Sequence, residues 1–308
     1  MSSTAEHRIR SLDRVAGFAA PQPVMSPSDA DEIIKPALSR WEAKTATEAR
    51  ERYDSLLHEV PDQAAPDSFW HSAASLTFKE FFTWGHNQDF GYGVSRFGAM
   101  GNRHTEIVGE SLMNGMLPAD LRGKRVLDIG CWSGGDVLLL SGLGAQVTAL
   151  EEHPIAAAAA RRLCDIVGCD AEIVSGSLYQ DRQDWSQGFD LIYCAGVVYH
   201  VTDPLLFLRI CFAYLRPGGR IVLETKSMDG PGSYCEHAGT LEKGWNWFSP
   251  TRDAFGRWLV DVGFDQDTTE LYERPIGRLL AASTKIEICR LPEPAGFSRP
   301  GSWLEGEV

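Results

Sequence analysis

One stretch of the chain decides the fold: Arg125-Val126-Leu127-Asp128-Ile129-Gly130-Cys131-Trp132-Ser133-Gly134-Gly135. It begins as a short aliphatic run, typical of a buried strand, and breaks into glycines from which a helical run, 136–143, follows at once. In this arrangement, backbone N–H groups at the helix start can face a ligand closely. Gly130 permits a positive φ at the turn, and Gly134 leaves no Cβ between backbone and ligand. An ordinary strand-to-helix connection is the alternative interpretation.

Acidic residues near this turn indicate what it would bind. A dinucleotide fingerprint needs G-x-G-x-x-G, whereas the order here is Asp128-x-Gly130-x-x-x-Gly134. A carboxylate two residues before the first glycine would repel a pyrophosphate but attract an amino group. A second predicted strand, 147–150, ends in Glu151, where a ribose diol would lie. Asp128 and Glu151 therefore favour a ligand with an ammonium and a ribose but no phosphates, and S-adenosylmethionine fits that description.

The segment 126–135 resembles the first signature of class I S-adenosylmethionine-dependent methyltransferases, usually written D-x-G-x-G-x-G. Trp132 replaces the usual middle glycine, so its ring would lean over the cofactor or into substrate space. Gly176-Ser177-Leu178 stands where these enzymes place a turn against the adenine, with Ser177 in place of the usual acid. The resemblance implies S-adenosyl-L-methionine as cofactor, bound by Asp128, Gly130, Cys131, Trp132, Gly134, Glu151, Ser177, Leu178 and Gly196.

Strands alternate with helical runs through the rest of the chain, which indicates a parallel sheet. We expect an α/β, Rossmann-like methyltransferase fold with a seven-stranded, mostly parallel sheet flanked by helices. The last two strands, near 268–272 and 283–289, would form a hairpin-like edge. The predicted parts are a flexible lead-in (1–27), an N-terminal helical cap and substrate lid (28–117), the S-adenosylmethionine-binding methyltransferase domain (118–291) and a tail (292–308).

Residues 66–104 are the most unusual part, because aromatic side chains crowd together there among histidines and glycines. In one interpretation the rings only pack a cap onto the catalytic domain. In the other, a few polar groups point inward from an aromatic wall that covers the substrate. The predicted substrate-binding residues are Trp84, His86, Asp89 and Tyr92 in this lid, with Trp245 and Trp247 opposite it. We predict no metal site, because His71, His86 and His104 lack a typical ligand spacing.

The fourth predicted strand, 189–194, is followed by Gly196-Val197-Val198-Tyr199-His200, at the sheet edge where the methyl group would be transferred. This segment resembles the bacterial transferases that modify the wobble uridine of tRNA with a carboxylated S-adenosylmethionine, a similarity that covers about residues 120–265. In that family a tyrosine at the position of Tyr199 holds the extra carboxylate together with a lysine and an arginine. The lysine has no clear equivalent here, which favours a plain methyl donor.

Tyr199 and His200 are the predicted catalytic residues, although each could simply pack at the strand end. His200 would accept a proton from an oxygen or nitrogen nucleophile, since the unperturbed imidazole pKa lies near neutrality. Tyr199 would orient the substrate or shield the sulfonium. A thioether acceptor would release no proton, and aromatic faces would stabilise its sulfonium product. The lid also bears a weak similarity to bacterial methionine S-methyltransferases.

Composition sets the remaining expectations. The 308 residues carry a formal net charge of −13, which argues against a phosphate-backbone partner. No apolar run reaches the roughly 20 residues that cross a bilayer, and the first residues lack the apolar core of a signal peptide. Seven cysteines without C-x-x-C pairs indicate reduced thiols in the cytoplasm.

Three functions follow from the sequence. The first is methyl transfer to a small molecule, with S-methylation of a thioether such as methionine as one candidate. The second is modification of the tRNA wobble uridine, and the third is a non-catalytic module that binds S-adenosylmethionine. We expect a small-molecule partner, neither nucleic acid nor membrane, and a homodimer as the assembly to test.

Overall fold

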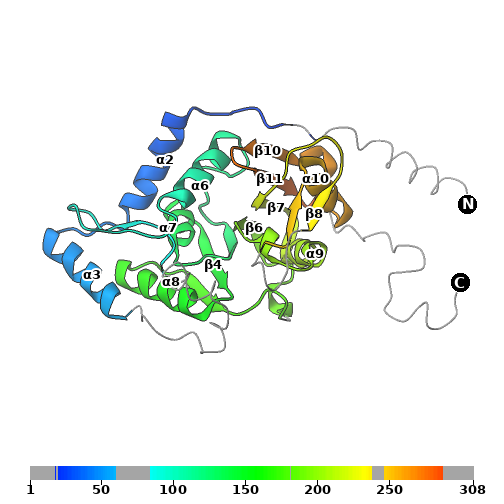
Figure 1. Cartoon of the computed structure of the whole chain (residues 1–308). Helices are drawn as coiled ribbons and strands as arrows, with labels where there is room; N and C mark the ends of the chain where they lie inside the picture. The colour runs from blue at the N-terminus through cyan, green and yellow to red at the C-terminus, as the bar shows by residue number, and fades with distance from the viewer. Residues whose placement is uncertain (1–17, 19, 60–83, 181, 238–245, 287–308) are drawn as a thin grey trace, which may run out of the picture.

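The computed structural model describes residues 18, 20–59, 84–180, 182–237 and 246–286 (Figure 1). Its centre is one seven-stranded sheet in the order β10-β11-β7-β6-β3-β4-β5. The five strands from β7 to β5 are parallel, and β11 and β10 add an antiparallel edge. The predicted sheet is therefore confirmed. Its strands are β3 (Arg125–Ile129), β4 (Gln146–Glu151), β5 (Glu172–Ser175), β6 (Phe189–Ala195), β7 (Leu215–Lys226), β10 (Glu270–Arg274) and β11 (Arg278–Thr284).

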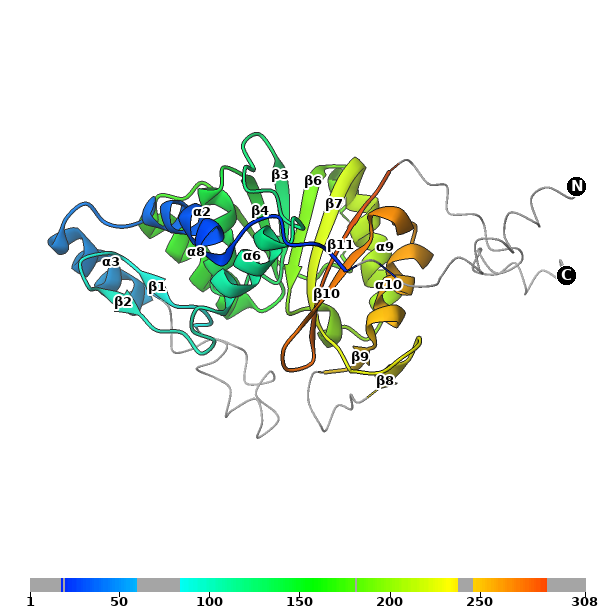
Figure 2. The ribbon, with the colours of Figure 1, turned by 90° about the horizontal axis from the view of Figure 1, so that it is seen from above.

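Helices cover both faces of this sheet (Figure 2). The first face packs against α2 (Pro27–Ser39), α6 (Arg103–Met113), α7 (Gly135–Gly142) and α8 (Pro154–Val167), and α3 (Ala46–Glu59) lies against α8. The second face packs against α9 (Pro204–Tyr214) and α10 (Arg252–Asp261). Short 3₁₀ turns occur at η2 (Gln183–Trp185), η3 (Val198–His200) and η4 (Gln266–Thr268). Two apolar cores result, one on each side of the sheet.

Local sequence signals explain where several helices begin and end. Ser26 and Asp29 form a capping box at the start of α2. Pro154 occupies the first turn of α8, and Gly168, with φ of 75°, ends that helix in the left-handed conformation. The sequence suggests that α6 continues to Leu117, but the helix ends at Met113, because Gly115 turns the chain with a φ of 66°.

The antiparallel edge departs from the sequence expectation. β11 begins at Arg278, five residues earlier than the predicted start of that strand. A three-residue turn, 275–277, separates the paired residues Arg274 and Arg278, and within it Ile276 and Gly277 have positive φ values of 67° and 64°. The turn joins β10 directly to β11, so the predicted hairpin-like edge is confirmed, but its last strand lies at Arg278–Thr284, earlier than the predicted 283–289.

Two small hairpins stand beyond the carboxyl ends of the parallel strands, one on each side (Figure 2). The first, on the side of α2 and α6, pairs β1 (Gln88–Asp89) with β2 (Ser95–Arg96). The second, on the side of α10, pairs β8 (Cys235–His237) with β9 (Phe248–Pro250). None of the helices in the described part of the chain is long and apolar enough to cross a membrane.

Candidate active site

The neighbouring strands β3 and β6 send their chains to opposite faces of the sheet. β3 leads into α7 on the first face, and β6 leads through η3 into α9 on the second. Such a switch point is where open α/β sheets bind ligands, outside the carboxyl ends of the strands. A Cβ on Gly130 would overlap the side chain of Val197, so the turns after β3 and β6 lie directly against each other.

Trp132 adopts the conformation that a glycine would supply. Its φ is 49°, a left-handed value that is uncommon for a residue with a side chain. The Trp132 N–H donates to Glu151 Oε2 at 2.8 Å, and the His153 N–H donates to Glu151 Oε1 at 2.8 Å. The loop therefore keeps a glycine-like backbone despite the bulky residue, and it fixes the Glu151 carboxylate at the end of β4.

The two glycines at the start of α7, Gly134 and Gly135, have separate roles. Gly134 has a φ of 92°, and a Cβ there would lie 3.3 Å from Ala160 of α8, so the missing side chain lets this helix approach. Gly135 is the glycine that faces the lid, because a Cβ there would lie 2.6 Å from His86 Nδ1. The close approach predicted at Gly134 thus involves a neighbouring helix.

Two buried carboxylates lie on the first face behind the glycine turn. Asp128 is 1% exposed and Asp136, in the first turn of α7, is 5% exposed. Burial raises the pKa of Asp128 well above its usual range, and the nearby Asp136 and Glu151 add to the effect. Burial likewise raises the pKa of Asp136 to about 7, against the opposing influence of the Tyr193 hydroxyl.

Each of these two acidic groups has an oxygen without a partner in the described part of the chain. Among the described residues, Oδ2 of Asp128 and Oδ1 of Asp136 accept no hydrogen bond, although buried polar atoms normally have a partner. An ammonium group would supply charge and donors together. The donor-poor, acidic site therefore fits the amino group of S-adenosylmethionine. Sequence reasoning missed Asp136, whose position in the first turn after the glycines was the available signal.

A network of ion pairs lies at the end of β7, next to β6. Glu224, 1% exposed near the end of β7, accepts from Arg278 Nε at 2.6 Å and from Arg274 Nη1 at 3.1 Å. Nη2 of Arg103, on α6, lies 3.5 Å from Oε1 of Glu224. Arg274 also forms an ion pair with Glu110. The sequence did not reveal this network, because its members are far apart along the chain.

The predicted catalytic pair lies beside that network. Tyr199 is half-buried, and its hydroxyl accepts a hydrogen bond from Arg278 Nη2 at 3.3 Å. The Arg278 guanidinium also lies 4.6 Å from the centre of the Tyr199 ring. His200 is exposed, with its ring centre 4.0 Å from that of Tyr199. A Cβ on Gly196 would lie 3.7 Å from the Tyr199 hydroxyl, so Gly196 and Tyr199 share one corner of the site.

The lid docks on the glycine turn through backbone contacts. The N–H groups of Gly85 and His86 donate to Ser133 Oγ at 3.0 and 3.3 Å. A Cβ on Gly85 would overlap the Trp132 ring, which therefore lies flat against the lid. Trp84 is buried next to this contact, and the Arg96 guanidinium covers its ring at 4.3 Å. The structure thus brings two predicted lid residues, Trp84 and His86, to the candidate site.

The other predicted substrate-binding residues lie in different surroundings. Asp89 accepts hydrogen bonds from Gly91 and Ser95 within the β1–β2 hairpin. The Tyr92 hydroxyl donates to the Lys44 carbonyl at 2.6 Å, at the connection between α2 and α3. Trp245 lies outside the described residues. Trp247 is half-buried beside the predicted catalytic pair, since its backbone N–H donates to the Tyr199 carbonyl at 2.7 Å.

The residues predicted to contact the adenine lie where β5 ends. The Gly176 N–H donates to the Glu151 carbonyl at 2.9 Å, which aligns this turn with the end of β4. Ser177 is half-buried, whereas Leu178 belongs to the core of the second face. The Cys131 side chain is buried in the opposite core, so a ligand would meet its backbone. Over the described residues, no group of three or more His, Cys, Asp or Glu side chains is arranged to hold a metal ion. His71 lies outside them.

We expect Ser133→Ala to loosen the lid. The change removes the acceptor shared by two buried N–H groups, each of which costs about 1–3 kcal/mol when unpaired. Hydrogen exchange at the Gly85 and His86 amides should accelerate about tenfold or more. Ser175→Ala, at an exposed position, is the matched control. Unchanged exchange in Ser133→Ala would show that this hydroxyl does not hold the lid.

Comparison with known proteins places this site in a family. A family model described as a methyltransferase domain matches residues 103–269, more than half of the chain. A tRNA U34 carboxymethyltransferase from Alteromonas mediterranea is 31% identical over 156 residues, covering 47% of this chain and 46% of that protein. A ubiquinone biosynthesis O-methyltransferase from Xanthomonas oryzae pv. oryzae is 34% identical over 110 residues, covering 34% of this chain and 44% of that protein. The chain spans about half the length of the curated relatives it matches.

A solved S-adenosylmethionine-dependent methyltransferase from Mesorhizobium loti is similar with a TM-score of 0.46 and 21% identity, over 55% of this chain and 94% of that one. The family match includes the glycine turn, the two buried carboxylates, Glu151, Tyr199 and His200. The chain belongs to the methyltransferase domain family, in its class I, S-adenosylmethionine-dependent branch.

Proposed function

We propose that this protein transfers the methyl group of S-adenosylmethionine to a small molecule at the carboxyl ends of β3 and β6. The observation that carries the proposal is the pair of buried carboxylates, Asp128 and Asp136, behind a glycine turn at the switch point. In the proposed site they hold the amino group of the cofactor. Glu151 accepts from the ribose hydroxyls, and Ser177 and Leu178 border the adenine.

The bound cofactor supplies an activated methyl group, so the protein mainly has to align the acceptor and exclude water. The lid contributes by covering the glycine turn with Trp84 and His86. Tyr199, held by Arg278, orients the acceptor from the β6 side. His200, exposed beside it, accepts the proton of an oxygen or nitrogen acceptor. The net charge of −13 favours a small acceptor over a nucleic acid.

The proposal is tested by a methyl-transfer screen read by mass spectrometry. Its acceptors are amino acids, thioethers, phenols and tRNA, and the phenols are included because one relative is named an O-methyltransferase. Methylation of a small acceptor would support the proposal. If tRNA alone were modified, the small-molecule proposal would be rejected.

His200→Ala separates acceptor classes. Removing a general base should slow transfer to an oxygen or nitrogen acceptor by about 10²–10⁴-fold. Transfer to a thioether such as methionine should change little, because that reaction releases no proton. Rates with both acceptor types in the same variant provide the internal control. Equal losses would contradict the base role and leave His200 as a packing residue.

A second candidate is the carboxymethyl chemistry named for the tRNA U34 relatives. The contact of Arg278 with Tyr199 favours it, since a tyrosine and an arginine could together bind an extra carboxylate. Arg278, however, already donates hydrogen bonds from Nε and Nη2 to the Glu224 carboxylate. Competition calorimetry with S-adenosylmethionine and its carboxylated analogue separates the two: tighter binding of the analogue would favour tRNA modification.

The third candidate is a non-catalytic module that binds S-adenosylmethionine. For such a module we expect cofactor binding without methyl transfer to any acceptor in the screen. The predicted cytoplasmic location, homodimer and domain boundaries stay predictions. Fractionation, light scattering and limited proteolysis, respectively, test them.

A further inference from the structure

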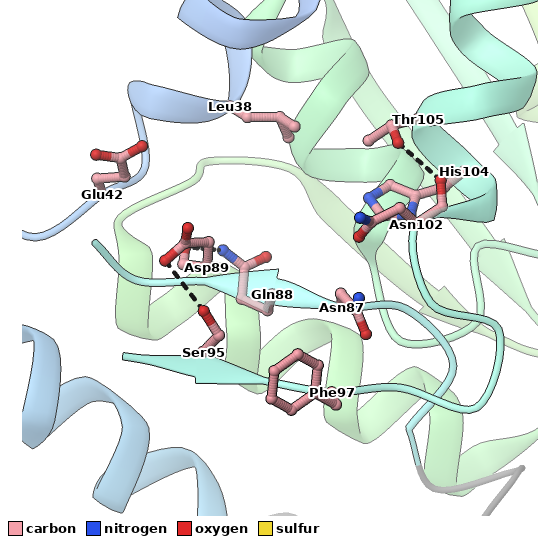
Figure 3. Close-up of a pocket in the computed structure, with 10 residues that line it drawn as sticks. All are labelled: Leu38, Glu42, Asn87, Gln88, Asp89, Ser95, Phe97, Asn102, His104 and Thr105. Carbon is pink, nitrogen blue, oxygen red and sulfur yellow. Dashed lines mark hydrogen bonds between the residues drawn. The ribbon is translucent and has the colours of Figure 1, made fainter. Parts of the chain in front are cut away.

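A separate cavity lies on the outer side of the lid. It has a volume of about 230 Å³, opens to solvent, and is bordered by the end of α2, the β1–β2 hairpin and the start of α6 (Figure 3). That is below the roughly 300–1,000 Å³ of pockets for drug-sized ligands, so it suits a smaller molecule. Its lining residues are Leu38, Glu42, Asn87, Gln88, Asp89, Ser95, Phe97, Asn102, His104 and Thr105.

The lining is polar and negatively charged. Two carboxylates, Glu42 and Asp89, face a wall of three carboxamides and two hydroxyls, and no Lys or Arg is among the lining residues. One oxygen of Asp89, Oδ1, already accepts from Gly91 and Ser95, and Oε1 of Glu42 accepts from Ser39. The cavity thus offers a formal charge of −2 with donors and acceptors on its walls.

A buried, unsatisfied polar atom independently indicates a ligand. His104 is 4% exposed and lines the cavity, and its Nδ1 makes no hydrogen bond to any described residue. Burial lowers the pKa of His104 to about 4, so the imidazole is neutral and adds no positive charge. Buried polar groups normally have partners, and a bound hydroxyl group would satisfy this one.

The cavity is distinct from the proposed methyl-transfer site. The His86 and His104 rings lie side by side, with centres 4.5 Å apart. Beyond them, His86 lies 5.6 Å from the Trp132 ring and against Gly135 on the glycine turn. These two rings separate the cavity from the cofactor side, so its occupancy does not depend on the proposed function.

We propose that this cavity binds a small organic cation that carries hydroxyl groups, such as an amino sugar or an amino alcohol. Its ammonium pairs with Glu42 and Asp89, while its hydroxyls bond to the carboxamides of Asn87 and Asn102 and to His104. The carboxylates select the charge, and the remaining polar wall selects a hydroxylated ligand over an apolar amine.

The test uses two matched pairs of probes that differ by one ammonium in place of one hydroxyl: D-glucosamine against D-glucose, and serinol against glycerol. Binding to the full chain at pH 6.5 is measured by calorimetry or saturation-transfer NMR. At least one amine should bind about five- to tenfold more tightly than its neutral counterpart, which is the summed effect of two ion pairs with the exposed carboxylates of Glu42 and Asp89.

The Glu42→Gln/Asp89→Asn double variant should lose that preference, because it removes both charges and keeps the shapes. Glu51→Gln, an exposed carboxylate on α3, is the control and should keep it. Circular dichroism and affinity for S-adenosylhomocysteine verify that each variant is folded. If neither amine binds better than its neutral partner, or if the double variant keeps the preference, the proposal is wrong.

Discussion

Asp128→Asn should lower the affinity for S-adenosylmethionine and S-adenosylhomocysteine by about 100-fold. Asp128 is buried at the end of β3, and Asn keeps its shape while removing the charge that faces the amino group in the proposed site. Truncating one partner of a buried charge pair typically costs about 2–5 kcal/mol, and about 2.7 kcal/mol corresponds to 100-fold. Isothermal titration calorimetry with S-adenosylhomocysteine measures the loss.

The same variant should be more stable than the wild type without cofactor. The folded-state pKa of Asp128 is raised above its unfolded value, so the native state binds the proton more tightly. Stability therefore falls as the pH rises from the usual Asp pKa of about 3.9 through the folded pKa, and the full penalty applies above it. Asn does not titrate, so the gain in melting temperature should be largest at high pH and vanish below about pH 4.

Asp165→Asn on the exposed side of α8 is the matched control, with neither effect expected. Asp136, whose pKa is raised to about 7, makes the wild type lose stability as the pH rises between about 4 and 7. Unchanged cofactor affinity in Asp128→Asn would remove Asp128 from the site. Lowered affinity together with lowered apo stability would instead show that the carboxylate is structural.

Gly130→Ala should lower the free energy of unfolding by about 3 kcal/mol or more. Two costs add: the left-handed backbone, at roughly 1–2 kcal/mol, and overpacking against Val197, at about 1–3 kcal/mol. The change also separates the turns after β3 and β6, so cofactor affinity should fall with stability. Urea unfolding followed by circular dichroism gives the first value, and calorimetry gives the second.

Two further variants separate those costs. A Cβ at Gly168 has nothing within 4 Å, although the φ of 75° is also left-handed, so Gly168→Ala reports backbone strain alone. Val197→Ala removes the methyl that a Cβ on Gly130 would overlap, so Gly130→Ala/Val197→Ala should recover the packing cost. If Gly130→Ala destabilises no more than Gly168→Ala, the two turns do not meet as closely as the structure shows.

The sequence was sufficient for the features that depend on neighbouring residues. Aliphatic strands, glycine turns and helix starts are short-range signals, and their alternation predicted the parallel sheet from β3 to β7. The order D-x-G with a later acid indicated the cofactor. The edge strand β11 was misplaced, because its start depends on the three-residue turn 275–277, in which Ile276 has a positive φ that an isoleucine seldom adopts.

The candidate site was only partly predictable. Asp128, Gly130 and Glu151 carry local signals, and the structure brings them together at neighbouring strand ends. The position of Trp84 and His86 on the glycine turn depends on Ser133, nearly fifty residues further along the chain. Nothing in either segment by itself predicts that contact.

The sequence by itself thus determined the fold, the cofactor class and the turn that would hold it, because these rest on hydrophobic periodicity, on the glycine turn and on acidic residues at the ends of two predicted strands. Only the tertiary structure decided which charges are paired. It assigned three arginines to Glu224 and left Asp128 and Asp136 without a cation among the described residues. Burial and charge pairing depend on what packs around a side chain, and in this protein those neighbours come from distant parts of the chain.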